Sequence, residues 1–201
     1  MVSLDTNIRS LPGIYKRYAS LLEKLEIFSL RDFLFHIPTR YDDYSLISKI
    51  SDVQPGEIVT IRGEVADIKN QYTRRSFSLQ KAKIKDETGE INIIWFNQPY
   101  IAKNISLGDK ISLSGKIDLK GVSLQMISPD YEIGEINFLH TGRLVPVYPE
   151  TRGVSSKWLR RQIFKLLTEN INEIEEFMPE DLLKRNKLEI LPKALLNIHF
   201  P

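Results

Sequence analysis

The sequence contains no cysteine. This absence excludes disulfide bonds, thiol nucleophiles and every zinc site built on cysteine. No apolar run approaches the roughly 18 residues needed to span a bilayer, and Met1 to Ser10 lack the apolar stretch of a secretion signal. We therefore expect a reduced, cytoplasmic protein that has no membrane partner.

Catalytic and metal-binding motifs are also absent. The three histidines lie far apart in the sequence and lack metal-ligand spacing: His36, His140 and His199. No G-x-x-x-x-G-K-[ST], G-x-S-x-G or G-x-G-x-x-G motif occurs, and the one Gly-Lys pair, Gly115-Lys116, lies within a predicted strand. We therefore predict no catalytic residue, no metal site and no cofactor in this chain, and interpret it as a binding module.

The composition is that of an ordinary globular protein. Of the 201 residues, 42% are hydrophobic and 27% are charged, so a real core is expected. The formal net charge of +2 indicates little about partners; the distribution of the charge along the chain indicates more.

The first 50 residues are predicted to form two short helices. Tyr15, Tyr18, Leu22 and Leu25 recur at helical spacing. Ser29 is followed three residues later by an aspartate, the pattern of a helix N-terminus. The second helix is expected to stop before residue 38, a proline, because the residue before a proline disfavours the helical conformation.

From residue 57 onward the apolar period changes to two, which predicts strands. Turn signals at 86–89 and 120–121 separate neighbouring strands, and a short helix fits within 97–106. Five strands with a helix between the third and the fourth are typical of an OB-fold barrel. The strands are expected around 57–65, 81–85, 91–95, 111–117 and 122–126.

After Pro129 the strand alternation is lost. Pro146 and Pro149 indicate an extended crossing segment, and Ser155 or Ser156 is expected to cap a helix. The fold class is therefore α+β, mainly β: a five-stranded OB-fold barrel flanked by an N-terminal helical hairpin and C-terminal helices. The expected division is a helical segment (1–50), the OB-fold domain (51–135) and a segment of crossing chain and helices (136–201).

One segment, 69–85, carries a dense positive charge and no acidic residue. Alternation places three of its lysines on one outward strand face, and two aromatic residues are interleaved with the arginines. Cations neutralise phosphates, and aromatic rings stack on unpaired bases. The alternative is that these lysines only solvate and protect an open strand face. The candidate DNA-binding residues are Lys69, Tyr72, Arg74, Arg75, Phe77, Lys81, Lys83 and Lys85.

The next strand ends in an aromatic pair, Trp95-Phe96. Consecutive residues of a strand point to opposite faces, so only one of the two can face the interior. Trp95 shares its face with two isoleucines and is expected in the core, whereas the pattern leaves Phe96 unassigned.

Several blocks in order resemble the RecG family of branched-DNA helicases. Leu34 to Asp43 is similar to the family's "LLFHLPRRYED" signature, and Asp86 to Gly89 with Trp95 to Tyr100 resembles its "D-x-x-G…W/F-F-N-x-x-Y" block. Leu144 to Pro149 and Ala194 to Pro201 resemble "xxPVYPLT" and "ALxxIHFP". The resemblance extends from about residue 11 to 201.

The resemblance implies an OB-fold wedge that recognises branched DNA, such as replication forks and Holliday junctions, in recombination and repair. It implies that Tyr72 first and Phe77 second cap exposed bases, beside phosphate contacts from Arg74 and Arg75. It also implies that the natural chain continues into helicase motor domains, which would bind ATP and Mg, and that the protein is a monomer. Two alternatives are a general single-stranded nucleic-acid binder and an OB-fold platform for protein interactions.

Overall fold

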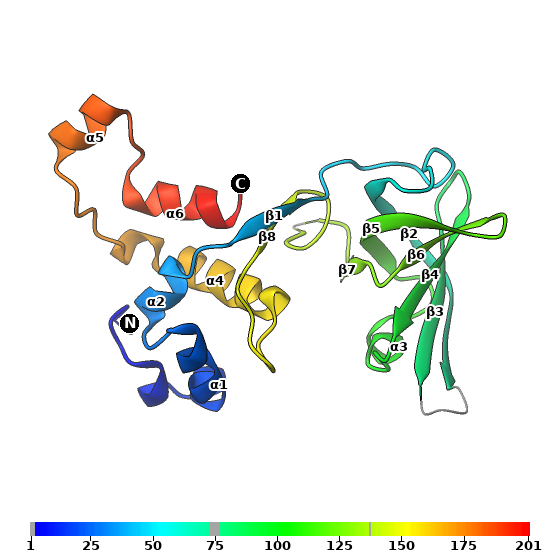
Figure 1. Ribbon diagram of the computed structural model, residues 1–201, viewed down its shortest axis with the longest axis horizontal. Coiled ribbons are helices and arrows are strands. Elements are labelled where there is room, and N and C mark those ends of the chain that lie inside the picture. The colour runs from blue at the N-terminus through cyan, green and yellow to red at the C-terminus, as the bar shows by residue number, and fades with distance from the viewer. Residues whose placement is uncertain (1–2, 73–76, 137) are drawn as a thin grey trace. The chain divides into compact units, whose positions relative to one another are not determined.

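The computed structural model of the chain describes residues 3–72, 77–136 and 138–201 (Figure 1). By contacts the chain groups into two compact units: Met1–Asp42 with Pro146–Pro201, the helical unit, and Asp43–Val145, the sheet unit. The first and last segments of the chain thus share one core. The division of the sequence into three segments (1–50, 51–135 and 136–201) stays a prediction. In the described part of the chain, no helix combines the length and the apolar character needed to cross a membrane.

The helical unit is built around one apolar core, to which both ends of the chain contribute. Leu22 and Phe33 from the first segment and Leu159 and Leu195 from the last are all almost fully buried there. The helices of the unit are η1 (Ile8–Ser10), α1 (Ile14–Leu22), η2 (Glu23–Leu25), α2 (Leu30–Phe35), α4 (Ser156–Asn170), η3 (Ile171–Glu173), α5 (Glu180–Asn186) and α6 (Leu191–His199).

Two predicted helix starts are confirmed. The Ser29 side chain accepts a hydrogen bond from the backbone N–H of Asp32, and the Asp32 carboxylate accepts one from the backbone N–H of Ser29. Reciprocal bonds of this kind satisfy two donors that a helix start otherwise leaves unpaired. Ser155 caps α4 by accepting from the backbone N–H of Trp158.

In its described residues, the sheet unit holds a sheet of six hydrogen-bonded strands and one short helix, α3 (Ile101–Asn104). The strand order is β2-β3-β4-β6-β5-β7, and β2 also pairs with β5, so that the first five strands close on themselves. This OB-like arrangement, with helices in the other unit, confirms the predicted fold class. The strands are β2 (Ile58–Tyr72), β3 (Ser78–Lys85), β4 (Glu90–Phe96), β5 (Lys110–Lys120), β6 (Ser123–Ile127) and β7 (Asp130–Ile133).

The structure adds strands that the sequence pattern did not predict. The five predicted strands end near residue 126, but a further strand, β7, follows Pro129 and pairs with β5. Strands β1 (Arg40–Asp43) and β8 (Leu144–Val147) pair as a separate two-stranded sheet. Each of the three has only four residues, too few for a clear alternation.

The core of the sheet unit lies inside the closed strands. Trp95 is 1% exposed, as predicted. Its indole N–H donates to the carbonyl oxygen of Pro129 at 3.1 Å, which satisfies the polar group that a buried tryptophan brings with it. Because Trp95 points inward, the next residue, Phe96, lies on the opposite face of β4.

Candidate nucleic-acid interface

Strand β3 buries one side and exposes the other. Ala82 and Ile84 are buried, whereas Lys81, Lys83 and Lys85 are exposed. Residues paired across neighbouring strands share a face, so this row continues onto β2 and β4. The prediction that these three lysines point outward from one strand is therefore confirmed. We call the exposed side of β2, β3 and β4 the outer face.

Several lysines of the outer face have a carboxylate beside them. Such exposed pairs contribute little to stability, but they reduce the positive charge available to a phosphate. Donation from the Lys69 ammonium group, the largest effect there, lowers the pKa of Asp67 below its usual value. The ion pairs join Lys69 to Asp67 (2.6 Å), Lys83 to Glu90 (3.1 Å) and Lys85 to Glu64 (3.3 Å).

Lys81 differs from its neighbours in the row. It makes no ion pair with any residue in the described ranges, and its cross-strand partners are Lys69 and Ile94. A second lysine directly opposite adds positive charge and supplies no counterion. Among the lysines on the outer face of β3, Lys81 therefore offers its charge most fully to an anion from solution.

Exposed aromatic side chains gather at the end of strands β2, β3 and β4. The rings of Phe77 and Phe96 contact each other, with centroids 6.0 Å apart. Tyr72 pairs in register with Ser78, the residue after Phe77. We call the four residues the aromatic end: Tyr72 (69% exposed), Phe77 (43%), Phe96 (39%) and Tyr100 (52%).

A tight turn after β4 holds this end in place. Asn97 has a left-handed backbone with φ of 55°, a conformation that asparagine tolerates better than most residues. Its backbone N–H donates to the carbonyl of Ser78 at 2.8 Å, and its side-chain oxygen accepts from the backbone N–H of Ser78 at 3.1 Å. Both bonds link β4 to the start of β3 and keep Phe96 beside Phe77.

The candidate residues from the sequence fall into three groups. Tyr72 and Phe77 are exposed at the aromatic end, and the four lysines lie along the strands. Arg74 and Arg75 lie outside the described residues. The sequence analysis did not name Phe96 or Tyr100 as candidate binding residues. Phe96 could have been found, because it follows the inward-pointing Trp95 in β4 and must therefore lie on the outer face.

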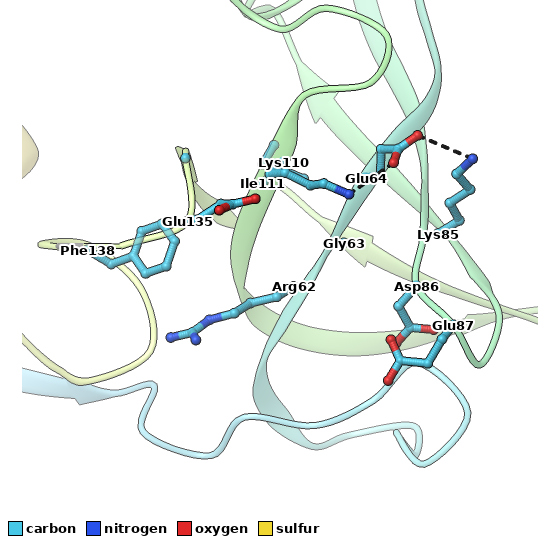
Figure 2. Close-up of a pocket in the computed structure, with 11 residues that line it drawn as sticks. Arg62, Gly63, Glu64, Lys85, Asp86, Glu87, Lys110, Ile111, Glu135 and Phe138 are labelled. Atoms are coloured by element: carbon cyan, nitrogen blue, oxygen red, sulfur yellow. Dashed lines mark hydrogen bonds and ion pairs between the residues drawn. The ribbon is translucent and has the colours of Figure 1, made fainter.

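A cleft of about 510 Å³ lies at the other end of β3 (Figure 2). Figure 2 shows Glu64 between two lysines: its carboxylate accepts from Lys110 at 3.0 Å and pairs with Lys85 at 3.3 Å. The hydrogen bond from Lys110, which has the largest effect, and the contact with Lys85 both lower the pKa of Glu64. The Arg62 guanidinium lies 5.0 Å from the ring centre of Phe138. Four carboxylates offset three cations around this cleft, so its charge does not favour a polyanion.

Metal binding finds no support in the described part of the chain. Within it, histidine and acidic side chains form no group of three or more that could hold a metal ion. The aromatic end offers exposed rings for stacking, and the lysines of β3 offer positive charge.

Curated relatives resemble the chain over nearly its whole length. It is 28% identical to the ATP-dependent DNA helicase RecG of Thermotoga maritima, covering 100% of this chain and 26% of the relative. It is 30% identical to the protein of the same name from Bacillus subtilis, covering 98% of this chain and 28% of the relative. The chain thus spans about a quarter of the length of these relatives.

A solved structure agrees with this likeness. The structure of RecG bound to a three-way DNA junction matches 100% of this chain and 28% of that one, with a TM-score of 0.76 and 27% sequence identity. The sequence model of one family, described as the RecG wedge domain, matches residues 7–174. That match covers well over half of the chain, which therefore belongs to the RecG wedge domain family.

Proposed function

We propose that this chain is the structure-specific DNA-binding wedge of an ATP-dependent helicase, and that the aromatic end contacts unpaired bases at a branch point. One observation carries the proposal: four exposed aromatic residues, two of them in ring contact, lie where β2, β3 and β4 end, and these strands bear the lysine row. Each ring can stack on a base for roughly 1–3 kcal/mol, whatever the base. Recognition would thus depend on DNA structure and not on sequence.

The relatives support branched DNA as the ligand. The matching RecG structure is bound to a three-way DNA junction, and replication forks and Holliday junctions offer the same feature, bases exposed where strands separate. The lysines would neutralise backbone phosphates beside those bases. Arg74 and Arg75, which lie outside the described residues, belong to the same proposal as phosphate contacts.

The rest of the reaction is proposed to lie outside this chain. The relatives are about four times as long and are ATP-dependent helicases, so ATP and Mg would be bound by motor domains that this chain does not include. The wedge would then hold the branch point while the motor moves the duplex, in recombination and repair. We further propose a monomer acting on DNA in the cytoplasm.

Two other functions remain as outcomes of the test. A general single-strand binder would hold a plain strand as tightly as a fork. A protein-interaction platform would bind no DNA. The match to a RecG structure over the whole chain, including the helical unit, favours the wedge over both.

The test compares binding of the 201-residue chain to a three-way fork, a duplex and a single strand by fluorescence anisotropy across salt concentrations. Tyr72→Ala and Phe96→Ala are each expected to weaken fork binding about 5- to 150-fold, the equivalent of one lost stacking contact. Phe177→Ala is the matched control, because Phe177 is 73% exposed but belongs to the helical unit.

The results separate the three functions. The wedge is supported if the chain binds the fork more tightly than the duplex and the single strand, if Tyr72→Ala and Phe96→Ala reduce this preference, and if Phe177→Ala leaves it unchanged. Equal affinity for fork and single strand would favour the general binder. No binding at low salt would overturn DNA binding by this chain and favour the platform.

A further inference from the structure

A continuous path of hydrogen bonds joins two exposed rings of the aromatic end through the interior of the sheet unit. The Tyr100 hydroxyl donates to Oε1 of Gln98 at 2.5 Å, and the Gln98 backbone N–H donates to Oε1 of Gln80 at 2.8 Å. Nε2 of Gln80 donates to Oδ1 of Asn70 at 2.8 Å, and Nδ2 of Asn70 donates to the Tyr72 hydroxyl at 3.0 Å. The side chain of Gln80 is the centre of this path.

Gln80 is an unusual residue for its position. It lies on the inward side of β3 with Ala82 and Ile84, opposite Trp95, and is 0% exposed. A buried amide is unfavourable unless both of its ends are hydrogen-bonded. Here both ends are bonded, one toward the loop after β4 and one toward the end of β2, so the amide links two segments that an apolar side chain would leave unconnected.

We propose that Gln80 is a positioning residue that fixes Tyr72 and Tyr100 in the orientation in which they stack on unpaired bases. This proposal rests on the DNA-binding function above. Gln80 itself touches no DNA in it; the residue acts through Asn70 on one ring and through Gln98 on the other.

The physical benefit is order before binding. A freely rotating side chain loses conformational freedom when a ligand immobilises it, and that loss weakens binding about two- to tenfold per side chain. A hydroxyl already bonded to an amide removes part of this loss. It also engages the hydroxyl of each tyrosine in a bond to a neighbouring side chain, which leaves the ring face for a base.

The two phenylalanines of the aromatic end show why tyrosine is required at the other two positions. Phe77 and Phe96 hold each other by ring contact, with centroids 6.0 Å apart. No ring contact is recorded for Tyr72 or Tyr100 within the described residues, so their hydroxyl groups carry the positioning. The network therefore does for the tyrosines what direct packing does for the phenylalanines.

Asn70 allows a test at an exposed residue of the path, although its loss also removes the acceptor of the buried Gln80 amide. Asn70→Ala removes the bond to the Tyr72 hydroxyl, and Tyr72→Phe removes the same bond from the other side while keeping the ring. Each is expected to weaken fork binding of the 201-residue chain about two- to tenfold. The double variant is expected to lose no more than Asn70→Ala alone, because Asn70→Ala already removes the bond that Tyr72→Phe removes.

Gln80→Met tests the centre of the path, since methionine keeps a similar length and removes the amide. It is expected to weaken fork binding about as much as Asn70→Ala and Tyr100→Phe combined. A fork with 2-aminopurine at the branch point is expected to show less quenching with Gln80→Met at saturating protein, because the rings stack less well. A merely structural role would leave that quenching unchanged at saturation.

Ser114→Ala is the matched control for lost stability. The Ser114 hydroxyl is also fully buried and lies 2.6 Å from the Thr60 hydroxyl, but it belongs to β5 and has no link to the aromatic end. Its loss is expected to lower stability and leave fork affinity and quenching unchanged. Additive losses of affinity for Asn70→Ala and Tyr72→Phe would overturn the positioning role, and so would normal quenching with Gln80→Met. If Tyr72→Ala still weakens binding in that case, the proposed function stands without the positioning role. No effect of Tyr72→Ala would instead remove the proposed function.

Discussion

The Tyr148 hydroxyl lies 2.8 Å from Nδ1 of His199, and both side chains are buried in the helical unit. Nε2 of the same imidazole lies 2.8 Å from the carbonyl oxygen of Leu34. A carbonyl oxygen can only accept, so Nε2 carries the proton and Nδ1 accepts from Tyr148. The neutral ring thereby joins α2, α6 and Tyr148, the residue that follows β8, in one bonded cluster.

This geometry predicts that stability depends on pH. Burial, the largest effect, lowers the pKa of His199, and burial also lowers the pKa of His36, which stacks on Tyr148. In the unfolded chain these groups titrate near about 6.5, so below that pH the unfolded state binds more protons than the folded state. The contribution of the two histidines to the free energy of unfolding is therefore expected to be complete above about pH 6.5. It is expected to be lost as the pH falls below that value and through the lowered folded-state pKa values.

Urea unfolding of the chain between pH 8 and pH 5 measures this dependence. In His199→Gln, which cannot be protonated in this range, the decrease between pH 7 and pH 5 should become shallower, even if the variant is less stable at every pH. An unchanged decrease would show that other groups carry the dependence. Tyr148→Phe removes the bond to Nδ1 without removing the titrating group, so the decrease should remain.

A second prediction concerns the close approach of β3 to Gly63 in β2. A Cβ added at Gly63 would lie 2.4 Å from the carbonyl oxygen of Lys85 and 2.8 Å from a methyl group of Ile84. Both distances are shorter than real contacts, so the strands would have to separate. Gly63→Ala is expected to lower the free energy of unfolding by roughly 1–3 kcal/mol, measured by urea unfolding.

Gly115→Ala is the control for this prediction. A Cβ there would lie 3.2 Å from the side chain of Pro129, a tight contact that a small shift relieves. Its cost is expected to be clearly smaller than that of Gly63→Ala. Equal costs at the two glycines would mean that loss of strand flexibility, and not the approach of Lys85, decides the outcome.

How far the sequence predicts this protein depends on whether a feature is local. Alternation alone places Lys81 outward and Trp95 inward, because the side-chain period of a strand is two. The Ser29–Asp32 cap is equally local, since its partners are three residues apart. The wedge assignment also follows from the sequence, because several short blocks occur together in order.

The contacts that organise the aromatic end are not local. Gln80 reaches Asn70 only because β2 continues to residue 72 and shifts its register between Val65 and Asp67. A pattern with a period of two does not report such a shift, and without it the pairing of Asn70 with Gln80 cannot be derived. The bond that positions Tyr100 is not local either, because it leads through Gln98 to Gln80, which is 18 residues from Gln98 in the sequence.

The last prediction separates the lysines of β3 by their neighbours. Lys85 already pairs with Glu64 at 3.3 Å, whereas Lys81 has a lysine opposite and no ion pair with a described residue. Lys81→Ala should therefore weaken binding to fork, duplex and single strand by a similar factor. It should also reduce the slope of log affinity against log salt by about 1, because one phosphate contact is lost.

Lys85→Ala is the matched variant, with the same substitution on the same face of the same strand. Its removal leaves Glu64 paired with Lys110 at 3.0 Å, so the local charge changes little where a phosphate would lie. We expect a smaller loss of affinity and a nearly unchanged salt slope, both measured by anisotropy across salt concentrations. If the two variants lose affinity equally, the DNA backbone follows the whole lysine row and the carboxylates exchange for phosphates on binding. If only Lys81→Ala changes the slope, the ion pairs of the folded protein already determine which lysine meets the DNA.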